Sequence, residues 1–233
     1  MGIRMDPRQL FFDDRLRGSC IYCGRVPSTR DHVPSRVLLD EPYPNNLPVV
    51  EACRRCNQGF SKDEEYLACF LECVIHGTTT PDKRFRPQVS TILASRPKLR
   101  VRIEKSKRTD GSNGLVWHPA AERVEKIVMK LARGHIAYEL GNLHLEPPQF
   151  MAISPFPLMS AEQQLRFNSS SGEVSGWPEI GSRAFINIGK DRPSAYDSWN
   201  NLQDGNYRYS IRQSAGDEVR LVIREYLACI VVW

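Results

Sequence analysis

The stretch CIYCGRVPSTRDHVPSRVLLDEPYPNNLPVVEACRRCN, residues 20–57, decides the fold of the first third of this chain. It begins with Cys20-Ile-Tyr-Cys23 and ends just after Cys53-Arg-Arg-Cys56, so two C-x-x-C pairs stand 29 residues apart. Each pair can present two thiolates from a tight turn to one tetrahedral zinc ion. Because four thiolates leave no position for water, we expect a structural Zn²⁺ at Cys20, Cys23, Cys53 and Cys56, in place of the hydrophobic core that so short a loop-rich segment lacks.

The composition of the whole chain is that of a soluble globular protein. Of its 233 residues, 41% are hydrophobic and 25% are charged, which allows one large domain or a small module with a second domain. Apolar stretches such as Leu227–Trp233 are far shorter than the ~20 residues of a membrane helix, and the N-terminus lacks the apolar core of a signal peptide. We therefore expect a cytoplasmic protein with no membrane partner, in which the C-x-x-C pairs bind metal rather than form disulfides.

Positive charge is concentrated in the middle third of the chain. The formal net charge is +5, and residues 81–150 hold 14 Lys and Arg against 7 Asp and Glu. Such a segment suits a polyanionic partner, because phosphate contacts supply most of the sequence-independent affinity for nucleic acid. A solvated basic surface with no ligand is the alternative.

Periodicity predicts a helix directly after the cysteine stretch. Ser61 and Glu64 have the spacing of a capping box, and apolar residues then recur at helical intervals as far as Gly77, so we expect a helix over about 62–76. Residues 77–88 are rich in Gly, Thr and Pro, which is typical of a linker. We place a domain boundary near residue 80.

The basic segment is predicted to contain a strand and an amphipathic helix. Alternating apolar residues over Lys98–Glu104 indicate a strand that carries Arg100 and Arg102 on one face. Residues 120–140 show helical spacing with an apolar face and a basic face. We expect five of these basic side chains to bind phosphate groups: Arg100, Arg102, Lys126, Lys130 and Arg133.

The C-terminal part is predicted to be mixed α and β. Strand-like runs lie near Arg183–Ile188, Tyr207–Gln213 and Val219–Val232, separated by Pro and Gly. The predicted fold class is therefore α+β, with a zinc-stapled module over residues 1–80. Residues 81–233 would form a mixed α/β region that recognises nucleic acid or another target.

The residues between and after the cysteine pairs distinguish among the classes of zinc module that such pairs can form. Asp31-His32-Val33-Pro34 follows the first pair, Asn46-Leu47 precedes the second, and Asn57 directly follows Cys56. In this order the chain resembles the HNH family, also called ββα-metal or His-Me finger nucleases, over about residues 18–76. The resemblance implies a treble-clef-like module in which a β-hairpin packs on a helix, with zinc at its base and the active site between hairpin and helix.

The resemblance also implies a role for each motif residue. His32 would be the general base, since imidazole can accept a proton from water near neutral pH. Asp31 and Asn57 would hold Mg²⁺ or Mn²⁺ through oxygen atoms, and Asn46 would orient the loop that carries the histidine. Whether an acid among Asp63, Glu64 and Glu65 assists the metal stays open, because carboxylates in the first turn of a helix also complement its dipole.

These expectations describe a metal-dependent endonuclease that acts on nucleic acid, with DNA favoured over RNA. An RNA or branched or modified DNA substrate fits the same residues, because the chemistry needs only a phosphodiester and a metal. A non-catalytic zinc module that binds nucleic acid or a protein is the alternative from another class. Phage defence is an expectation by analogy alone.

Overall fold

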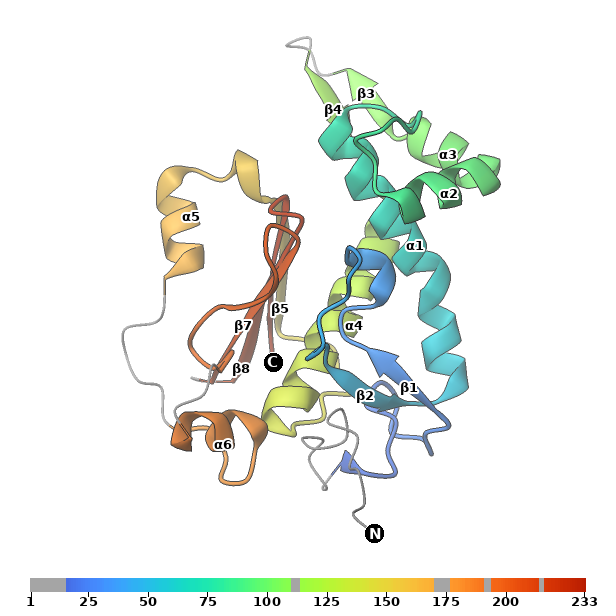
Figure 1. Cartoon of the computed structure of the whole chain (residues 1–233). Helices are drawn as coiled ribbons and strands as arrows, with labels where there is room; N and C mark the ends of the chain where they lie inside the picture. Colours follow the sequence, from blue (N-terminus) through green and yellow to red (C-terminus); the bar gives the residue numbers. More distant parts are fainter. Residues whose placement is uncertain (1–15, 110–113, 170–176, 191–193, 214–215) are drawn as a thin grey trace.

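The computed structural model describes residues 16–109, 114–169, 177–190, 194–213 and 216–233 (Figure 1). In these segments the chain is mixed α+β, as predicted. Its main core of buried apolar residues runs from Leu16 to Trp233 and is continuous across the boundary predicted near residue 80. Every helix of the described segments is too short or too polar to cross a membrane.

A short hairpin and a long helix follow the first cysteine pair. Strand β1 (Thr29–His32) pairs antiparallel with β2 (Val49–Ala52), and the 3₁₀ helix η3 (Arg36–Leu38) lies between them. Helix α1 (Arg54–His76) starts directly after β2 and ends at Gly77, whose φ of +68° closes it. The predicted end of this helix is confirmed, and the predicted start is wrong.

The start differs because Cys53, not Ser61, is the N-cap residue of α1. The Cys53 sulfur accepts a hydrogen bond from the backbone N–H of Cys56, which satisfies one of the free donors of the first turn. Ser61 lies inside the helix and donates to the carbonyl of Asn57. The spacing of Ser61 and Glu64 therefore has no capping function here.

The segment that follows α1 packs against it instead of forming a free linker. Phe85 is buried, and Arg86 donates from its backbone and side chain to the buried carboxylate of Glu72 on α1. Helices α2 (Pro87–Ser95) and α3 (Pro97–Glu104) come next, and then a small hairpin of β3 (Lys107–Thr109) and β4 (Leu115–Trp117).

The strand predicted over Lys98–Glu104 is wrong, because these residues form α3. Pro97 occupies the first turn, where its fixed φ favours a helix and its missing N–H costs nothing. Leu99 and Ile103 are also an i, i+4 pair, and Ile103 is fully buried while Val101 is 49% exposed. The alternating apolar and basic residues therefore belong to a helix that buries only one edge.

Helix α4 (Ala121–Leu140) occupies the centre of the molecule, as Figure 1 shows. It contacts α1 and β2 on one side and strand β8 (Asp217–Ile223) of the C-terminal region on the other. Its apolar face is buried as predicted, with Ile127, Val128 and Leu131 fully covered. The helix therefore connects the hairpin region with the C-terminal sheet.

The C-terminal region is an antiparallel five-stranded sheet in the order β5-β9-β8-β7-β6. The strands, in chain order from β5 to β9, are Phe150–Pro155, Asn200–Gln203, Tyr207–Gln213, Asp217–Ile223 and Leu227–Val232. The predicted strand Tyr207–Gln213 is confirmed. The run Val219–Val232 is two strands, separated by a turn in which Arg224 and Glu225 have positive φ.

Short helices complete this region, namely η4 (Phe156–Leu158), α5 (Ala161–Asn168) and α6 (Arg183–Gly189). The strand predicted near Arg183–Ile188 is wrong, because it is α6. Ser182 begins this helix by accepting a hydrogen bond from the N–H of Phe185 at 3.1 Å.

Candidate metal centre and the Asp31-His32 segment

The two C-x-x-C pairs come together at the base of the hairpin. Cys20 and Cys23 lie in a tight turn, where the N–H groups of Cys23 and Gly24 both donate to the carbonyl of Cys20. Gly24 has a φ of +71°, which glycine adopts without strain. The N–H of Ile21 donates to the carbonyl of Glu51, so this turn is fixed to β2, just before the second pair.

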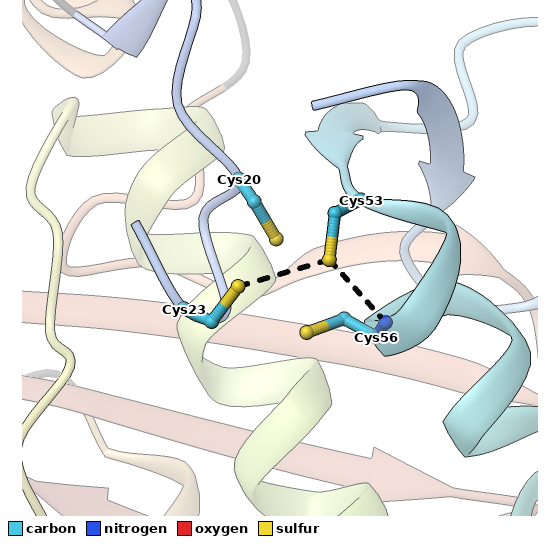
Figure 2. Close-up of side chains that lie close together, drawn as sticks. All are labelled: Cys20, Cys23, Cys53 and Cys56. Atoms are coloured by element: carbon cyan, nitrogen blue, oxygen red, sulfur yellow. Dashed lines mark hydrogen bonds between the residues drawn. The ribbon is translucent and has the colours of Figure 1, made fainter. Parts of the chain in front are cut away.

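The four sulfur atoms form a compact cluster (Figure 2). All lie within 4.8 Å of one another, and the sulfurs of Cys23 and Cys53 are 3.7 Å apart. A zinc ion with Zn–S bonds of about 2.3 Å places tetrahedral ligands about 3.8 Å apart. Of the described residues, only these four form such a group of possible ligands, and they could hold a structural metal ion such as zinc.

Hydrogen bonding and burial affect the thiols of this cluster differently. The backbone N–H of Cys56 is directed at the sulfur of Cys53 and lowers the pKa of that thiol to about 7. Burial raises the pKa of Cys20 and of Cys56. Cys53 therefore ionises to a thiolate, the form that binds metal, more readily than Cys20 or Cys56.

Asp31 on β1 belongs to a buried charged group, here named the Lys130 cluster and formed by Tyr22, Asp31, Glu64 and Lys130. The hydroxyl of Tyr22 donates to Oδ2 of Asp31 at 2.7 Å. The ammonium of Lys130 lies 3.0 Å from the same oxygen and 2.9 Å from Oε1 of Glu64. It also donates to the carbonyl of His32 at 3.0 Å. The cluster thereby joins the first cysteine turn, β1, α1 and α4.

Tyr22 remains a hydrogen-bond donor in this cluster at ordinary pH. Burial, followed by the negative charge of Asp31, raises its pKa well above the usual value. The phenol therefore stays protonated and keeps its hydrogen bond to Asp31. Because Tyr22 stands between Cys20 and Cys23, this bond connects the metal cluster with the residue before His32.

His32 is the last residue of β1 and is half-buried. Its Nε2 lies 3.3 Å from a terminal nitrogen of Arg36 in η3. A guanidinium can only donate, so Nε2 is the acceptor in this contact and a neutral ring carries its proton on Nδ1. In this geometry the lone pair of Nε2 is therefore engaged by Arg36.

Helix α4 approaches the chain very closely just after His32. Gly134 packs directly against Val33, and a Cβ atom at position 134 would lie 2.6 Å from one Val33 methyl carbon and 2.7 Å from the other. Real Cβ contacts are longer than this, so only glycine permits the observed spacing. Lys130 stands one helical turn earlier, which places its ammonium beside the His32 carbonyl.

Asn57, in the first turn of α1, fastens the helix to β1. Its Nδ2 donates to the carbonyl of Arg30 at 3.1 Å and to the hydroxyl of Thr29 at 3.2 Å. These bonds fix the orientation of the amide and leave its oxygen to accept. Asp31 likewise keeps Oδ1, which has no hydrogen bond within the described segments. Each of the two residues thus keeps one oxygen atom that makes no hydrogen bond to the described part of the chain.

Asn46 does not hold the loop after His32 in the way that the resemblance implies. It is exposed in a turn, and no hydrogen bond joins its side chain to the described part of the chain. The loop is held instead by Gln203 of β6, whose amide bonds both the N–H and the carbonyl of Asp40 at 2.8 Å. Arg86 adds a bond to the carbonyl of Val37.

The sequence did not decide whether Asp63, Glu64 or Glu65 assists the metal, and these three acids have different partners. Asp63 pairs with Arg123 and Lys126, Glu65 pairs with Arg96, and Glu64 belongs to the Lys130 cluster. Of the three, Glu64 alone shares a cation with Asp31.

The basic face of α4 is therefore mostly committed to contacts inside the protein. Lys130 is fully buried, so its predicted contact with phosphate is wrong. Lys126 bonds Asp63, and Arg133 donates to the carbonyls of Leu145 and Glu146. Arg100 and Arg102 are exposed, on α3 rather than on a strand. Helical spacing correctly identified basic residues that share one face of α4. It could not show that acids of α1 lie opposite this face and pair with them.

Comparison with protein-family models, with curated proteins and with solved structures found no match to this chain. Its function must therefore be inferred from its own residues.

Proposed function

We propose that this protein is a metal-dependent HNH-type endonuclease that hydrolyses phosphodiester bonds, with DNA as the first substrate to test. One observation carries the proposal. The Asp31-His32 segment and Asn57 lie on neighbouring elements joined by the bond from Asn57 to Arg30, at one end of the four-cysteine cluster. Binding nucleic acid or protein through a zinc module requires none of these three residues.

In the proposed reaction His32 is the general base. The imidazole accepts a proton from a water molecule as the water oxygen attacks the phosphorus atom, once the guanidinium of Arg36 has turned from Nε2 to a substrate phosphate. The bond from phosphorus to the 3′ oxygen breaks and the departing oxygen takes a proton from solvent water, which yields a 5′-phosphate and a 3′-hydroxyl. Arg36 is exposed beside His32, and its guanidinium has the geometry to bind phosphate oxygens.

A Mg²⁺ or Mn²⁺ ion, held by Asp31 and Asn57, would stabilise the charge that develops on the phosphate and on the departing oxygen. Lys130 offsets the negative charge of Asp31 from 3.0 Å away. We therefore expect weak metal affinity in the free protein and stronger affinity once a substrate phosphate adds negative charge.

The test compares wild type with His32→Ala on supercoiled plasmid, single-stranded DNA and RNA, each with Mg²⁺, Mn²⁺ or EDTA. His118→Ala is the matched control, because it removes an exposed histidine that follows β4. The proposal predicts cleavage that is lost with EDTA and in His32→Ala and is retained in His118→Ala. Cleavage by His32→Ala would refute the role of the base. A folded, zinc-loaded wild type that cuts none of the substrates would favour the non-catalytic module.

A further inference from the structure

A basic groove lies between α1, the corner of α2 and α3, and the start of α4. Its volume is about 530 Å³. Five of the side chains that line it are cationic and one is acidic: Lys62, Arg96, Lys98, Arg102, Arg123 and Glu65. Of these cations, only Arg102 was among the basic side chains that the sequence predicted to bind phosphate. The others come together through the packing of three helices.

Three of the five cations have no acidic partner. Arg96 pairs with Glu65 and Arg123 with Asp63, which fixes both guanidinium groups at the wall of the groove. The exposed side chains of Lys62, Lys98 and Arg102 have no ion pair with any acid of the described residues. Like charges that converge without compensation attract an anion with several charged groups.

The N-terminus of α3 adds to this positive potential. Its first turn, Pro97 to Leu99, lines the groove, and it contains no acidic residue. The N-cap residue Arg96 offers no side-chain hydrogen bond to the free N–H groups. Pro97 has no N–H and that of Leu99 donates to the carbonyl of Arg96, so Lys98 alone offers a free backbone donor beside the partial positive charge of the helix end.

The groove is connected with the hairpin along α1. Lys62 follows Asn57 by five residues, a rise of about 7.5 Å along the helix axis. A second groove, bordered by Ser35 of the segment after His32 and by Ser61, also includes Glu65 in its wall. The two grooves share Glu65 in their walls, and Glu64 also lines the second one.

We propose that the basic groove binds the phosphodiester backbone of a nucleic-acid strand. The inference rests on the proposed function for the cutting site, whereas binding itself can be measured without cleavage. Lys62, Lys98 and Arg102 contact phosphates, and Arg96 and Arg123 shape the wall. The phosphate-binding surface is therefore this groove rather than the basic face of α4.

The test measures binding of labelled single-stranded DNA in EDTA, by fluorescence anisotropy over a range of KCl concentrations. The groove variant is Lys62→Gln with Lys98→Gln and Arg102→Gln. The matched control is Lys83→Gln with Lys105→Gln and Arg108→Gln, which removes the same charge from exposed positions that do not line the groove. Because each phosphate contact contributes a slope of about 0.7 for single strands, the plot of log affinity against log salt should flatten by about 2 in the groove variant. The control should keep the wild-type slope.

An equal change in both variants, or no change in the groove variant, would overturn the inference. If the groove variant loses affinity for polyglutamate as strongly as it loses affinity for DNA, the groove binds an acidic protein instead. The single variant Lys98→Gln, at an exposed site, should flatten the slope by about 0.7. It keeps the test valid if the triple variant does not fold. If wild type binds DNA through the groove and never cleaves it, the nuclease proposal fails, but the inference that the groove binds nucleic acid is retained.

Discussion

Replacing Lys130 with methionine should destabilise this protein strongly, although the side chains have similar length. The ammonium of Lys130 lies within 3.0 Å of the carboxylates of Asp31 and Glu64, and all three side chains are 10% exposed or less. Methionine would leave two buried negative charges without a counter-ion. Removing one partner from a buried ion pair costs about 3–5 kcal/mol, and two carboxylates place this variant at the upper end of that range.

For a chain of this size, about 5 kcal/mol corresponds to a fall in Tm of about 10–20 °C, measured by calorimetry. Lys126→Met is the control, because Lys126 also pairs with an acid of α1 and is 45% exposed. It should cost less than about 1 kcal/mol. Adding Asp31→Asn and Glu64→Gln to Lys130→Met should restore much of the stability, since no unpaired charge remains. A Tm for Lys130→Met equal to that of Lys126→Met would refute the reasoning.

Two further measurements test the metal cluster and the ion pairs of α1. Cys53→Ser should lower the zinc content and increase the sensitivity to protease, because Cys53 is both a predicted ligand and the N-cap of α1, whereas Cys73→Ala should keep its metal. Burial alone would raise the pKa of Asp63, but hydrogen bonds from Lys126 and Arg123 outweigh it and lower that pKa. The stability that Asp63 contributes is therefore present above its unfolded pKa of about 3.9 and is lost as the pH falls through the lower folded value. Urea unfolding of wild type and Asp63→Asn should show a constant difference from about pH 5 to 8 that shrinks below about pH 4, and a difference that persists in acid would contradict this assignment.

Local patterns in the sequence predicted those parts of the molecule that depend on local interactions. The C-x-x-C spacing predicted the four-cysteine cluster, because each pair needs only a tight turn to bring its thiols together. Gly77 marked the end of α1 for a similar reason, since a left-handed residue closes a helix wherever it stands. Alternation at Lys98–Glu104 misled because the i, i+4 pair Leu99 and Ile103 satisfies a strand pattern and a helix pattern alike.

Contacts between residues distant in sequence could not be foreseen in this way. The spacing of residues 120–140 placed Lys130 on a polar face, but the acids that face it come from residues 31 and 64. Gln203 holds the loop at Asp40 across 163 positions of sequence. The local pattern of a helix or a strand does not reveal partners so distant in sequence. The motif residues of the site could therefore be predicted, but the contacts that support them could not.

The glycine at position 134 limits how this protein can diverge. Any larger residue there would push α4 away from Val33 and withdraw Lys130 from Asp31 and the His32 carbonyl. A distant relative that keeps the Asp-His dipeptide should therefore keep Lys-x-x-x-Gly on a helix downstream, 98 positions away in this chain. Two C-x-x-C pairs occur in many unrelated metal-binding modules. The helical lysine and glycine are the more discriminating signature by which the lineage of this protein can be traced.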